Sequence, residues 1–282
     1  MEKLPIPYLL QQIPDVPTQL YIRGNFPDEN KYKFLAVIGS RKFSPYGKQA
    51  INKLIKEIAG YPIVIVSGLA LGIDSLAHEA ALENNLTTIA IPGSGLHDEV
   101  IYPASNQALA RRILQSGGAL LSEFEPDFKA TKWSFPQRNR IMAGISHAIL
   151  VIEAENKSGT RITARLATDY NREVFSVPGS VFSVTSKGTN ELIHEGATPV
   201  TSGKDILDFF NFNTEQNKEQ QASLFNNLSG DEQKVISLID TPLSQNEIAR
   251  ISGINIIALN ILLSSMEIKG LIKEEFGKIY KQ

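Results

Sequence analysis

The chain has no cysteine in its 282 residues. This absence excludes a disulfide framework, a thiolate zinc site and a cysteine nucleophile, and it fits a reducing compartment. The four histidines show no HExxH spacing, so we expect no catalytic metal site, although this spacing does not bear on carboxylate sites for magnesium. No hydrophobic run approaches the length of a membrane span, and prolines interrupt the amino-terminal segment where a signal peptide needs an apolar core. The sequence therefore predicts a cytoplasmic protein that does not contact a membrane.

The chain also has no excess of positive charge. The formal net charge is −2, so any binding of nucleic acid must come from a local concentration of cations. No GxxxxGK phosphate loop occurs, which argues against a P-loop ATPase. The stretch that begins at Gly93 meets the GxGxxG dinucleotide pattern weakly, because Asp98 stands where the last glycine belongs. We therefore expect no cofactor.

The main feature of the sequence is a series of short apolar runs. They are rich in β-branched residues, which is typical of strands buried on both faces of a parallel sheet. They cover residues 34–39, 62–66, 87–91, 119–122, 148–153 and 173–177. Helical patterns lie between them, for example at residues 45–59, 72–84, 105–116 and 160–170. This alternation predicts an α/β fold with a Rossmann-like, doubly wound, mostly parallel sheet.

Polar, glycine-rich turns follow several of these runs. In a doubly wound sheet such turns open on one edge, outside the carboxyl ends of the strands, where ligands bind. Gly39-Ser40-Arg41 suits a phosphate, but it also suits a tight turn with a surface arginine. Ser67-Gly68 is a second candidate for ligand contact. Ser158-Gly159-Thr160 enters a helix and serves as its cap, as an anion site, or as both.

The most informative stretch is Ser134-Phe135-Pro136-Gln137-Arg138-Asn139-Arg140. It places two arginines and an asparagine just past an aromatic-proline turn, between two predicted buried strands. The planar fork of arginine donors fits phosphate oxygens, so the cluster indicates a polyanionic partner. In the alternative, one arginine pairs with an internal carboxylate and the other lies on the surface. We expect both arginines to share an edge with Arg41.

No catalytic group of residues emerges from the sequence. Glu153 follows a predicted strand and suits either a general base or an ion pair with an arginine. His97 lies in a predicted loop without an assignable partner, whereas His78 and His194 fall within helical patterns. We therefore predict a binding protein and not an enzyme.

Composition divides the chain into four parts. Residues 1–33 are proline-rich and predict an irregular extension packed on a sheet domain of residues 34–210. Residues 211–227 are polar and predict a linker. Residues 228–282 predict a winged-helix-like domain of three helices and a small β-hairpin. Its helix at residues 255–269 has one lysine and no arginine, so we interpret this domain as a protein-contact module or a very weak DNA binder.

Taken in order, the turns resemble those of the DNA-processing protein A family, also called Smf, over most of residues 1–200. The resemblance rests on VIGSR (37–41), SGLALGID (67–74), GSGL with YPASN (93–106), LLSEF (120–124), FPQRNR (135–140), IEAENKSGTRITARLA (152–167), VPGS (177–180) and GTNELIHEGA (188–197). It implies a Rossmann-like domain that binds single-stranded DNA and helps to load the RecA recombinase, notably in natural transformation. It also implies dimerisation through the sheet domain.

Carried over by position, the resemblance implies a set of contacts with the DNA strand. They come from Ser40, Arg41, Lys132, Arg138, Asn139 and Arg140, with hydroxyl and backbone donors from Ser67, Gly68, Ser158, Gly159 and Thr160. Stacking of a base on Phe135 or Trp133 is a further expectation. The sequence departs from the family at Leu71, where arginine is common, and at Arg161, where a small or aliphatic residue is usual.

We therefore predict a single-stranded DNA-binding protein that protects incoming DNA and hands it to a recombinase. One alternative is a protein-interaction adaptor whose pocket is vestigial. The other is a nucleotide-processing enzyme of the lysine-decarboxylase-like (LOG) type, which shares a related sheet. That family carries a PGGxGTxxE pattern. The comparable stretch here, residues 156–160, lacks the glycine pair, and Thr163 stands at the glutamate position.

Overall fold

The structure is a computed structural model, and it describes residues 2–156, 158–212, 229–239, 242–268, 271–275 and 277–281. The chain forms two compact units, Met1–Phe212 and Asn213–Gln282. The predicted linker at residues 211–227 lies outside the described residues, except for residues 211 and 212.

The larger unit is built around one sheet, with the strand order β1-β2-β6-β5-β4-β3-β7-β8-β9. The strands are β1 (Glu2–Lys3), β2 (Tyr21–Gly24), β3 (Lys33–Ile38), β4 (Ile63–Ser67), β5 (Thr88–Ala90), β6 (Ala119–Ser122), β7 (Ala148–Val151), β8 (Glu173–Ser176) and β9 (Thr198–Pro199). The seven strands β3 to β9 run parallel to one another. β1 is antiparallel to β2, and β2 is antiparallel to β6. The predicted apolar runs are β3 to β8, so the Rossmann-like fold class is confirmed.

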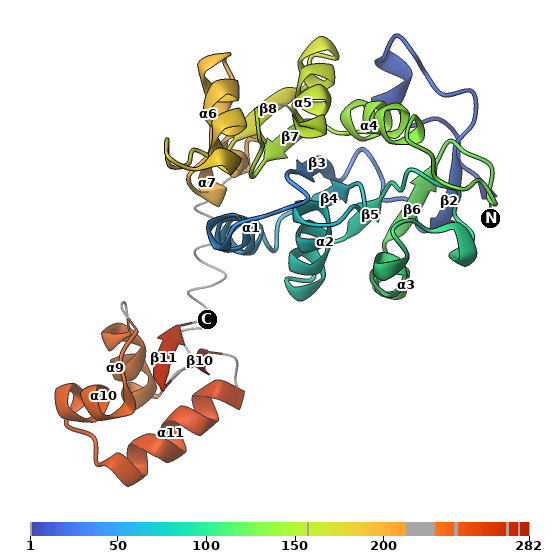
Figure 1. Ribbon diagram of the computed structural model, residues 1–282. Coiled ribbons are helices and arrows are strands. Elements are labelled where there is room, and N and C mark those ends of the chain that lie inside the picture. The colour runs from blue at the N-terminus through green and yellow to red at the C-terminus, as the bar shows by residue number, and fades with distance from the viewer. Residues whose placement is uncertain are drawn as a thin grey trace. The chain divides into compact units, whose positions relative to one another are not determined.

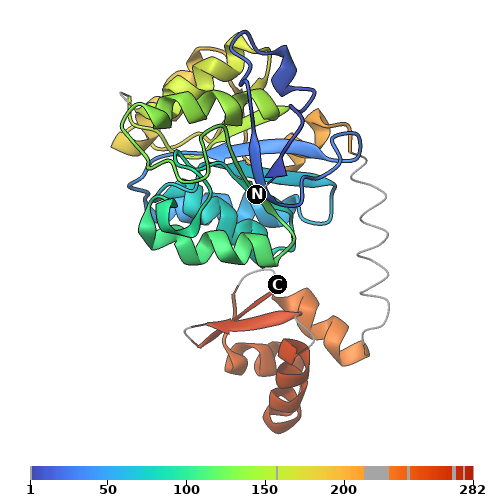
Figure 2. The same ribbon diagram turned by 90° about the vertical axis from the view of Figure 1, so that its right-hand side faces the viewer.

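Helices cover both faces of this sheet. They are α1 (Pro45–Glu57), α2 (Ile73–Glu83), α3 (Gln107–Gln115), α4 (Ser134–Ile145), α5 (Gly159–Asp169), α6 (Lys187–His194) and α7 (Gly203–Phe209). Short 3₁₀ turns occur at Leu10–Gln12, Asp98–Val100, Ala104–Asn106 and Val184–Ser186. Figures 1 and 2 show α4, α5 and α6 on one face of the sheet and α1, α2 and α3 on the other.

Alternating side chains of the central strand β3 face the two helical layers. Phe34, Ala36 and Ile38 belong to a buried cluster that includes side chains of α4 and α5. Leu35 and Val37 belong to a second cluster, with side chains of α1 and α2. Because successive side chains of a strand point to opposite faces, a strand covered on both sides must be apolar throughout. This burial explains the continuous apolar runs in the sequence.

Helix α4 lies where the sequence analysis placed an aromatic-proline turn, and that expectation is wrong. Pro136 is the third residue of α4. Proline is tolerated in the first helical turn, because the backbone N–H groups there have no acceptor within the helix. The arginines that follow therefore lie on a helix and not on a loop, which decides the directions in which they point.

Residues 1–33 were expected to be irregular, and the structure differs there too. β2 pairs antiparallel with β6, with Tyr21 opposite Ser122 and Gly24 opposite Ala119. Leu10 and Ile13 lie against Gly144 of α4, where a Cβ would clash with both side chains. The segment thus completes one edge of the sheet. A four-residue strand between prolines gives little local signal, because its pairing depends on the distant strand β6.

The described residues of the smaller unit form three helices followed by a hairpin, the order predicted for a winged-helix-like domain. Its elements are α9 (Gly230–Leu238), α10 (Gln245–Ser252), α11 (Ile256–Ile268), β10 (Ile272–Glu275) and β11 (Lys278–Lys281). Ser229 and Ser244 each form a capping box with the glutamate three residues later. Gly253 ends α10 in the left-handed conformation, which glycine adopts without strain.

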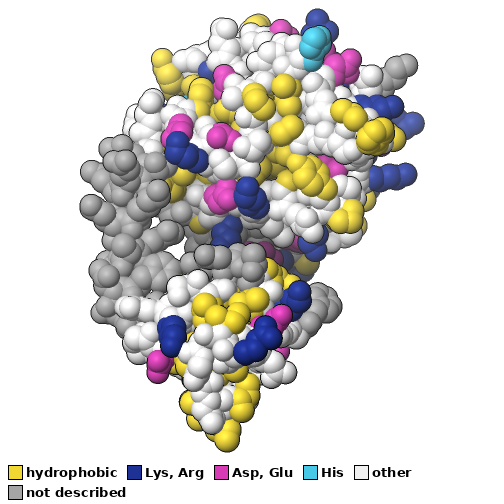
Figure 3. Space-filling model, turned by 90° about the vertical axis from the view of Figure 1, so that its left-hand side faces the viewer, with side chains coloured by type: hydrophobic (Ala, Val, Ile, Leu, Met, Phe, Trp, Pro, Cys, Tyr) yellow, Lys and Arg dark blue, Asp and Glu magenta, His cyan; other side chains and the backbone are white. Residues whose placement is uncertain are grey.

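The exposed face of α11 carries isoleucines together with Asn260 and Ser264, and its first charged side chain is Glu267. Ile257 and Ile261 are each 70% exposed, and residues 251–266 contain no charged side chain. Figure 3 shows hydrophobic side chains at the surface of this unit. On the larger unit, the same view shows lysine and arginine side chains dispersed among acidic ones, with no continuous basic surface.

Within the described part of the chain, no single helix is both long and apolar enough to cross a membrane. The bent pair Gln245–Ser252 and Ile256–Glu267 meets these criteria only when its two helices are counted together.

Candidate functional site

The order of the sheet reverses beside β3. The chain moves from β3 to β4 and β5 on one side and later from β7 to β9 on the other. Loops at the carboxyl ends of β3 and β7 therefore diverge and leave a crevice. A cleft of about 730 Å³ lies at this point. Most of the residues predicted from the sequence line it: Gly39, Ser40, Arg41, Lys132, Phe135, Arg138, Asn139, Ser158, Gly159 and Thr160.

Exposed cations stand at the rim of this cleft. Arg41 and Lys42 come from the loop after β3, and Lys132 comes from the segment before α4. None of them forms an ion pair with any residue that the structure describes. Their charges are therefore available to an anionic ligand. Lys42 was not among the residues predicted from the sequence, although its place directly after Arg41 was a usable signal.

Ser40 shapes the loop that carries these cations. Its backbone N–H donates to the carbonyl of Glu153 at 2.8 Å, which ties the loop to the end of β7. Its hydroxyl donates to the Lys42 carbonyl at 2.7 Å and accepts from the Lys42 N–H at 3.1 Å. The hydroxyl is thus satisfied internally and positions Arg41 and Lys42.

The amino terminus of α5 forms the opposite wall. The first N–H groups of a helix lack acceptors within it and favour a negative charge. Ser158 precedes the helix, and its Oγ is buried without a hydrogen-bond partner among the described residues. Gly159 is exposed, with open space where a Cβ would stand. This end of the helix can accept an anion that the rim cations attract.

Arg138 lies at the bottom of the cleft and is only 5% exposed. Its guanidinium donates to the carbonyls of Gly68 and Ile91, at the ends of β4 and β5. Burial lowers the pKa of Arg138 to about 10, while the nearby charge of Asp74 opposes the shift. Asp74 Oδ2 accepts from the Gly68 N–H at 3.1 Å. Arg138 thus joins the ends of two strands beneath the site.

Arg140 does not reach the cleft. It pairs with Glu123 and, at 3.4 Å, with Asp15, and its side chain is 12% exposed. Residues two apart on a helix point about 200° away from each other, because each residue turns the helix by about 100°. Arg138 and Arg140 therefore face opposite sides of α4, and the expectation of a shared edge is wrong. Arg140 joins the amino-terminal segment to the end of β6.

Ser67 and Gly68 also lie outside the cleft lining. Ser67 is fully buried, and its hydroxyl donates to the Val37 carbonyl at 2.6 Å across the sheet. A Cβ on Gly68 would clash with the Arg138 guanidinium and with the Asp74 carboxylate. Both residues build the floor that supports the site.

Aromatic side chains complete the rim. Phe135 lies with its ring centroid 5.5 Å from the Arg41 guanidinium carbon and 5.5 Å from the Tyr102 ring. Tyr102 also lines the cleft, although it was not among the residues predicted from the sequence to contact a ligand. Trp133 points elsewhere, because its ring packs edge-on against Phe124 and Phe128 and does not line the cleft.

The buried acidic and histidine side chains near the cleft have structural roles. Glu153 accepts from the Ser44 hydroxyl at 2.6 Å and the Thr185 hydroxyl at 2.7 Å, so its partners are hydroxyl groups and not an arginine. Burial raises the pKa of Asp74, against the opposing charge of Arg138. Burial also lowers the pKa of His78 to about 3. In the part of the chain that the structure describes, no group of three or more His, Cys, Asp or Glu residues is placed to hold a metal.

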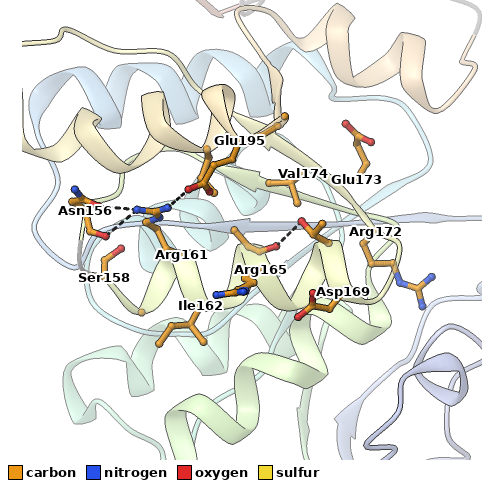
Figure 4. Close-up of a pocket in the computed structure, with 16 residues that line it drawn as sticks. Asn156, Ser158, Arg161, Ile162, Arg165, Asp169, Arg172, Glu173, Val174 and Glu195 are labelled. Carbon is orange, nitrogen blue, oxygen red and sulfur yellow. Dashed lines mark hydrogen bonds and ion pairs between the residues drawn. The ribbon is translucent and has the colours of Figure 1, made fainter.

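A second pocket, of about 960 Å³, lies on the far side of α5 (Figure 4). Arg161 contacts Asn156 Oδ1 at 2.7 Å and pairs with Glu191 and Glu195, each at 2.5 Å. The remaining charged lining residues are of both signs: Arg165, Asp169, Arg172 and Glu173. This balance does not favour an anion, so the smaller cleft is the better candidate for a phosphate-bearing ligand.

Comparison with known proteins agrees with this geometry. A family model described as DNA recombination-mediator protein A matches residues 2–211. The chain belongs to this family. The DNA processing protein DprA of Streptococcus pneumoniae is 43% identical over 206 residues, which cover 73% of this chain and 71% of that protein. DprA of Bacillus subtilis is 40% identical, over 72% of this chain and 67% of that protein. The protein Smf of Escherichia coli is 41% identical, over 70% of this chain and 52% of that protein.

Solved structures of family members match as well. The crystal structure of DprA from Streptococcus pneumoniae superposes with a TM-score of 0.67 and 42% identity, covering 72% of this chain and 70% of that one. A structure of DprA from Helicobacter pylori, described for its single-stranded DNA binding mode, has a TM-score of 0.66 and 35% identity. It covers 74% of this chain and 94% of that one.

Proposed function

We propose that this member of the DNA recombination-mediator protein A family binds single-stranded DNA in the cleft between β3 and β7. Arg41, Lys42 and Lys132 attract the phosphates, and the amino terminus of α5 receives one of them. The observation that carries the proposal is the set of rim cations without internal partners at the point where the sheet order reverses. The single-stranded DNA binding mode described for the Helicobacter pylori relative supports it.

The protein would act by handing the bound strand to a recombinase. The family's description as a recombination mediator supports this step. We propose RecA as the recombinase, incoming DNA of natural transformation as the cargo and the cytoplasm as the location. We further propose that two copies associate through the larger unit and that the protein carries out no chemistry itself. Light scattering would test the dimer, and RecA filament assembly on a protein-coated strand would test the transfer.

The nucleotide-processing alternative lacks support from this site. Its glutamate position is held by Thr163, whose hydroxyl donates to the Gly159 carbonyl at 3.3 Å. Of the two carboxylates that line the cleft, Asp74 accepts from the Gly68 N–H and Glu155 is exposed.

Fluorescence anisotropy of a labelled oligo-dT strand, with an unlabelled duplex as competitor, tests the proposed function. We expect salt-sensitive binding that prefers the single strand and weakens at least tenfold in Arg41→Ala/Lys132→Ala. The matched control is Lys48→Ala/Lys56→Ala, which removes the same charge from exposed positions of α1. If the wild-type protein does not bind the strand, the proposal fails, and hydrolysis of nucleoside monophosphates becomes the next assay.

A further inference from the structure

Trp133 is the only tryptophan in the chain, and it lies at the surface outside the cleft. Its ring packs edge-on against Phe124 and Phe128, with centroid distances of 5.6 and 5.5 Å. These two phenylalanine rings stack on each other at 4.5 Å and form a firm support. Trp133 is nevertheless 55% exposed, although tryptophan is a well-buried residue on average. The indole is therefore held by the protein on one side and open to solvent on the other.

The backbone around Trp133 is fixed by its neighbour Ser134. The Ser134 side chain is fully buried, and its hydroxyl donates to the Gly93 carbonyl at 2.6 Å and accepts from the Thr131 N–H at 3.0 Å. Trp133 itself has helical backbone angles, although it precedes the first residue of α4. A ring on a backbone held in this way loses little conformational freedom when it receives a ligand.

Two lysines stand beside this residue in the chain. Lys132 directly precedes Trp133 and lines the cleft, and Lys129 is exposed three residues earlier. Neither lysine forms an ion pair with a residue that the structure describes. Asp127 is also exposed and offsets part of their charge, so this surface does not act by charge alone. An exposed aromatic ring with free cations suits a single strand, because bases stack on the ring while the cations hold phosphates.

Trp133 and the cleft lie on opposite sides of the amino terminus of α4. Phe135 faces Arg41 and Gly93 in the cleft, and Trp133 precedes it by two residues, which turns the two side chains about 200° apart. Lys132 connects the two sides, because it lines the cleft and its Cα lies about 3.8 Å from that of Trp133. A strand with a phosphate at Lys132 therefore has an adjacent base within reach of the indole.

We propose that a bound single strand leaves the cleft across the amino terminus of α4, and that one of its bases stacks on Trp133. This inference rests on the proposed binding of single-stranded DNA and adds to it a contact outside the cleft. The contact requires only the π-face of an unstacked base, so it is sequence-tolerant. A duplex, whose bases are stacked on one another, cannot make it.

Tryptophan fluorescence tests the proposal directly, because every change in tryptophan emission comes from Trp133. Wild type is titrated with oligo-dT of about 12 nucleotides, a length within the usual range of binding sites, and with an abasic strand of equal length. Anisotropy of labelled copies of both strands shows when each is saturating. We expect saturating oligo-dT to quench the emission, since a stacked base contacts the indole, and the saturating abasic strand to leave it unchanged.

Affinities of variants give a second measurement. Trp133→Ala should weaken oligo-dT at least about fivefold and the abasic strand less than about twofold, as the usual contribution of one stacked base implies. Trp133→Phe retains a ring and should stay close to wild type. Phe182→Ala is the matched control, because it removes a 92% exposed ring from the loop after β8, outside the cleft, and should leave both affinities unchanged.

The inference is overturned if both saturating strands change the emission equally, a result that needs no variant and does not depend on how Trp133→Ala folds. It is also overturned if Trp133→Ala weakens oligo-dT no more than Phe182→Ala does. If wild type binds neither strand by anisotropy, the proposed function itself fails and this inference falls with it.

Discussion

At the scale of single residues, three arginines have three different roles around this site. Arg41 is exposed at the rim of the cleft without an ion pair to any described residue. Arg138 is buried and joins the ends of β4 and β5 through their carbonyls. Arg140 pairs with Glu123 and Asp15 on the other side of α4. The sequence pattern placed Arg41 and Arg138 at one edge of the sheet, where the cleft lies. The separate role of each arginine depends on the direction in which its side chain leaves α4 or the loop after β3, which the pattern does not show.

Replacing Arg140 should cost stability and not DNA binding. Arg140→Ala leaves the nearly buried Glu123 without its partner, and breaking a buried pair typically costs about 3–5 kcal/mol. Urea denaturation measures the free energy of unfolding. The control is Arg111→Ala, whose partner Asp98 is about half exposed, so the expected change is below about 1 kcal/mol. Equal losses of unfolding free energy in the two variants would show that the buried Glu123 pair contributes no more than an exposed one.

His78 should make the larger unit sensitive to acid. Burial lowers the pKa of His78 to about 3, below the ordinary value of 6.5. The unfolded chain therefore binds a proton in this interval that the folded protein excludes. The contribution of His78 to the free energy of unfolding is fully present above pH 6.5. It is lost as the pH falls toward 3, by about 1.4 kcal/mol per pH unit. Denaturation of His78→Gln between pH 7 and 4 should show a shallower loss, whereas the exposed His194→Gln should keep the wild-type slope.

At the scale of elements, one carboxylate ties the loop after β3 to the strand beside it. Glu153 follows β7 and accepts from both the hydroxyl and the backbone N–H of Ser44. Ser44 caps α1, accepting from the Gly47 N–H at 3.2 Å. The loop that carries Arg41 and Lys42 is therefore fixed at both ends, by β3 and by the capped helix.

Removing this cap should loosen the loop. Ser44→Ala is expected to cost about 1 kcal/mol of stability, the usual effect at an N-cap, and to weaken binding of oligo-dT less than fivefold. Thermal unfolding and anisotropy measure the two effects. Ser116→Ala, which removes a hydroxyl bound only to its own helix at Ile113, is the control. A loss of binding without a loss of stability would mean that the Ser44 hydroxyl itself contacts the ligand.

Elements were predictable where local pattern and burial agree. The strands from β3 to β8 are covered on both faces, so their apolar runs are visible in the sequence. β2 was missed because its stability comes from pairing with β6, which lies about a hundred residues later. α4 was missed because Pro136 was interpreted as a turn residue, although the first helical turn accepts proline. Tyr102 was missed as a cleft residue because its place beside Phe135 depends on a contact between distant segments.

At the scale of the whole molecule, the candidate site lies entirely within the larger unit. All its lining residues belong to residues 38–163. The smaller unit has its own core, which includes Val235, Ile248, Leu259 and Ile279. Its helix α11 offers exposed isoleucines and no lysine or arginine over residues 256–268. This surface is suited to contact with protein more than to contact with DNA.

A chain ending at Phe212 should therefore fold and retain the site. We expect it to bind oligo-dT within about threefold of the affinity of the whole chain, because each unit has its own core. Circular dichroism checks folding and anisotropy checks affinity. A tenfold loss in the folded fragment would place part of the binding surface in the smaller unit.

The salt dependence of strand binding tests the central claim most directly. Three cations at the rim, Arg41, Lys42 and Lys132, predict a slope of about −2 when the logarithm of the association constant is plotted against that of salt concentration. Arg41→Ala/Lys132→Ala should reduce the slope to about −0.7, whereas Lys48→Ala/Lys56→Ala should leave it near −2. If the two double variants keep the same slope as wild type, the strand is not held by the rim cations of this cleft.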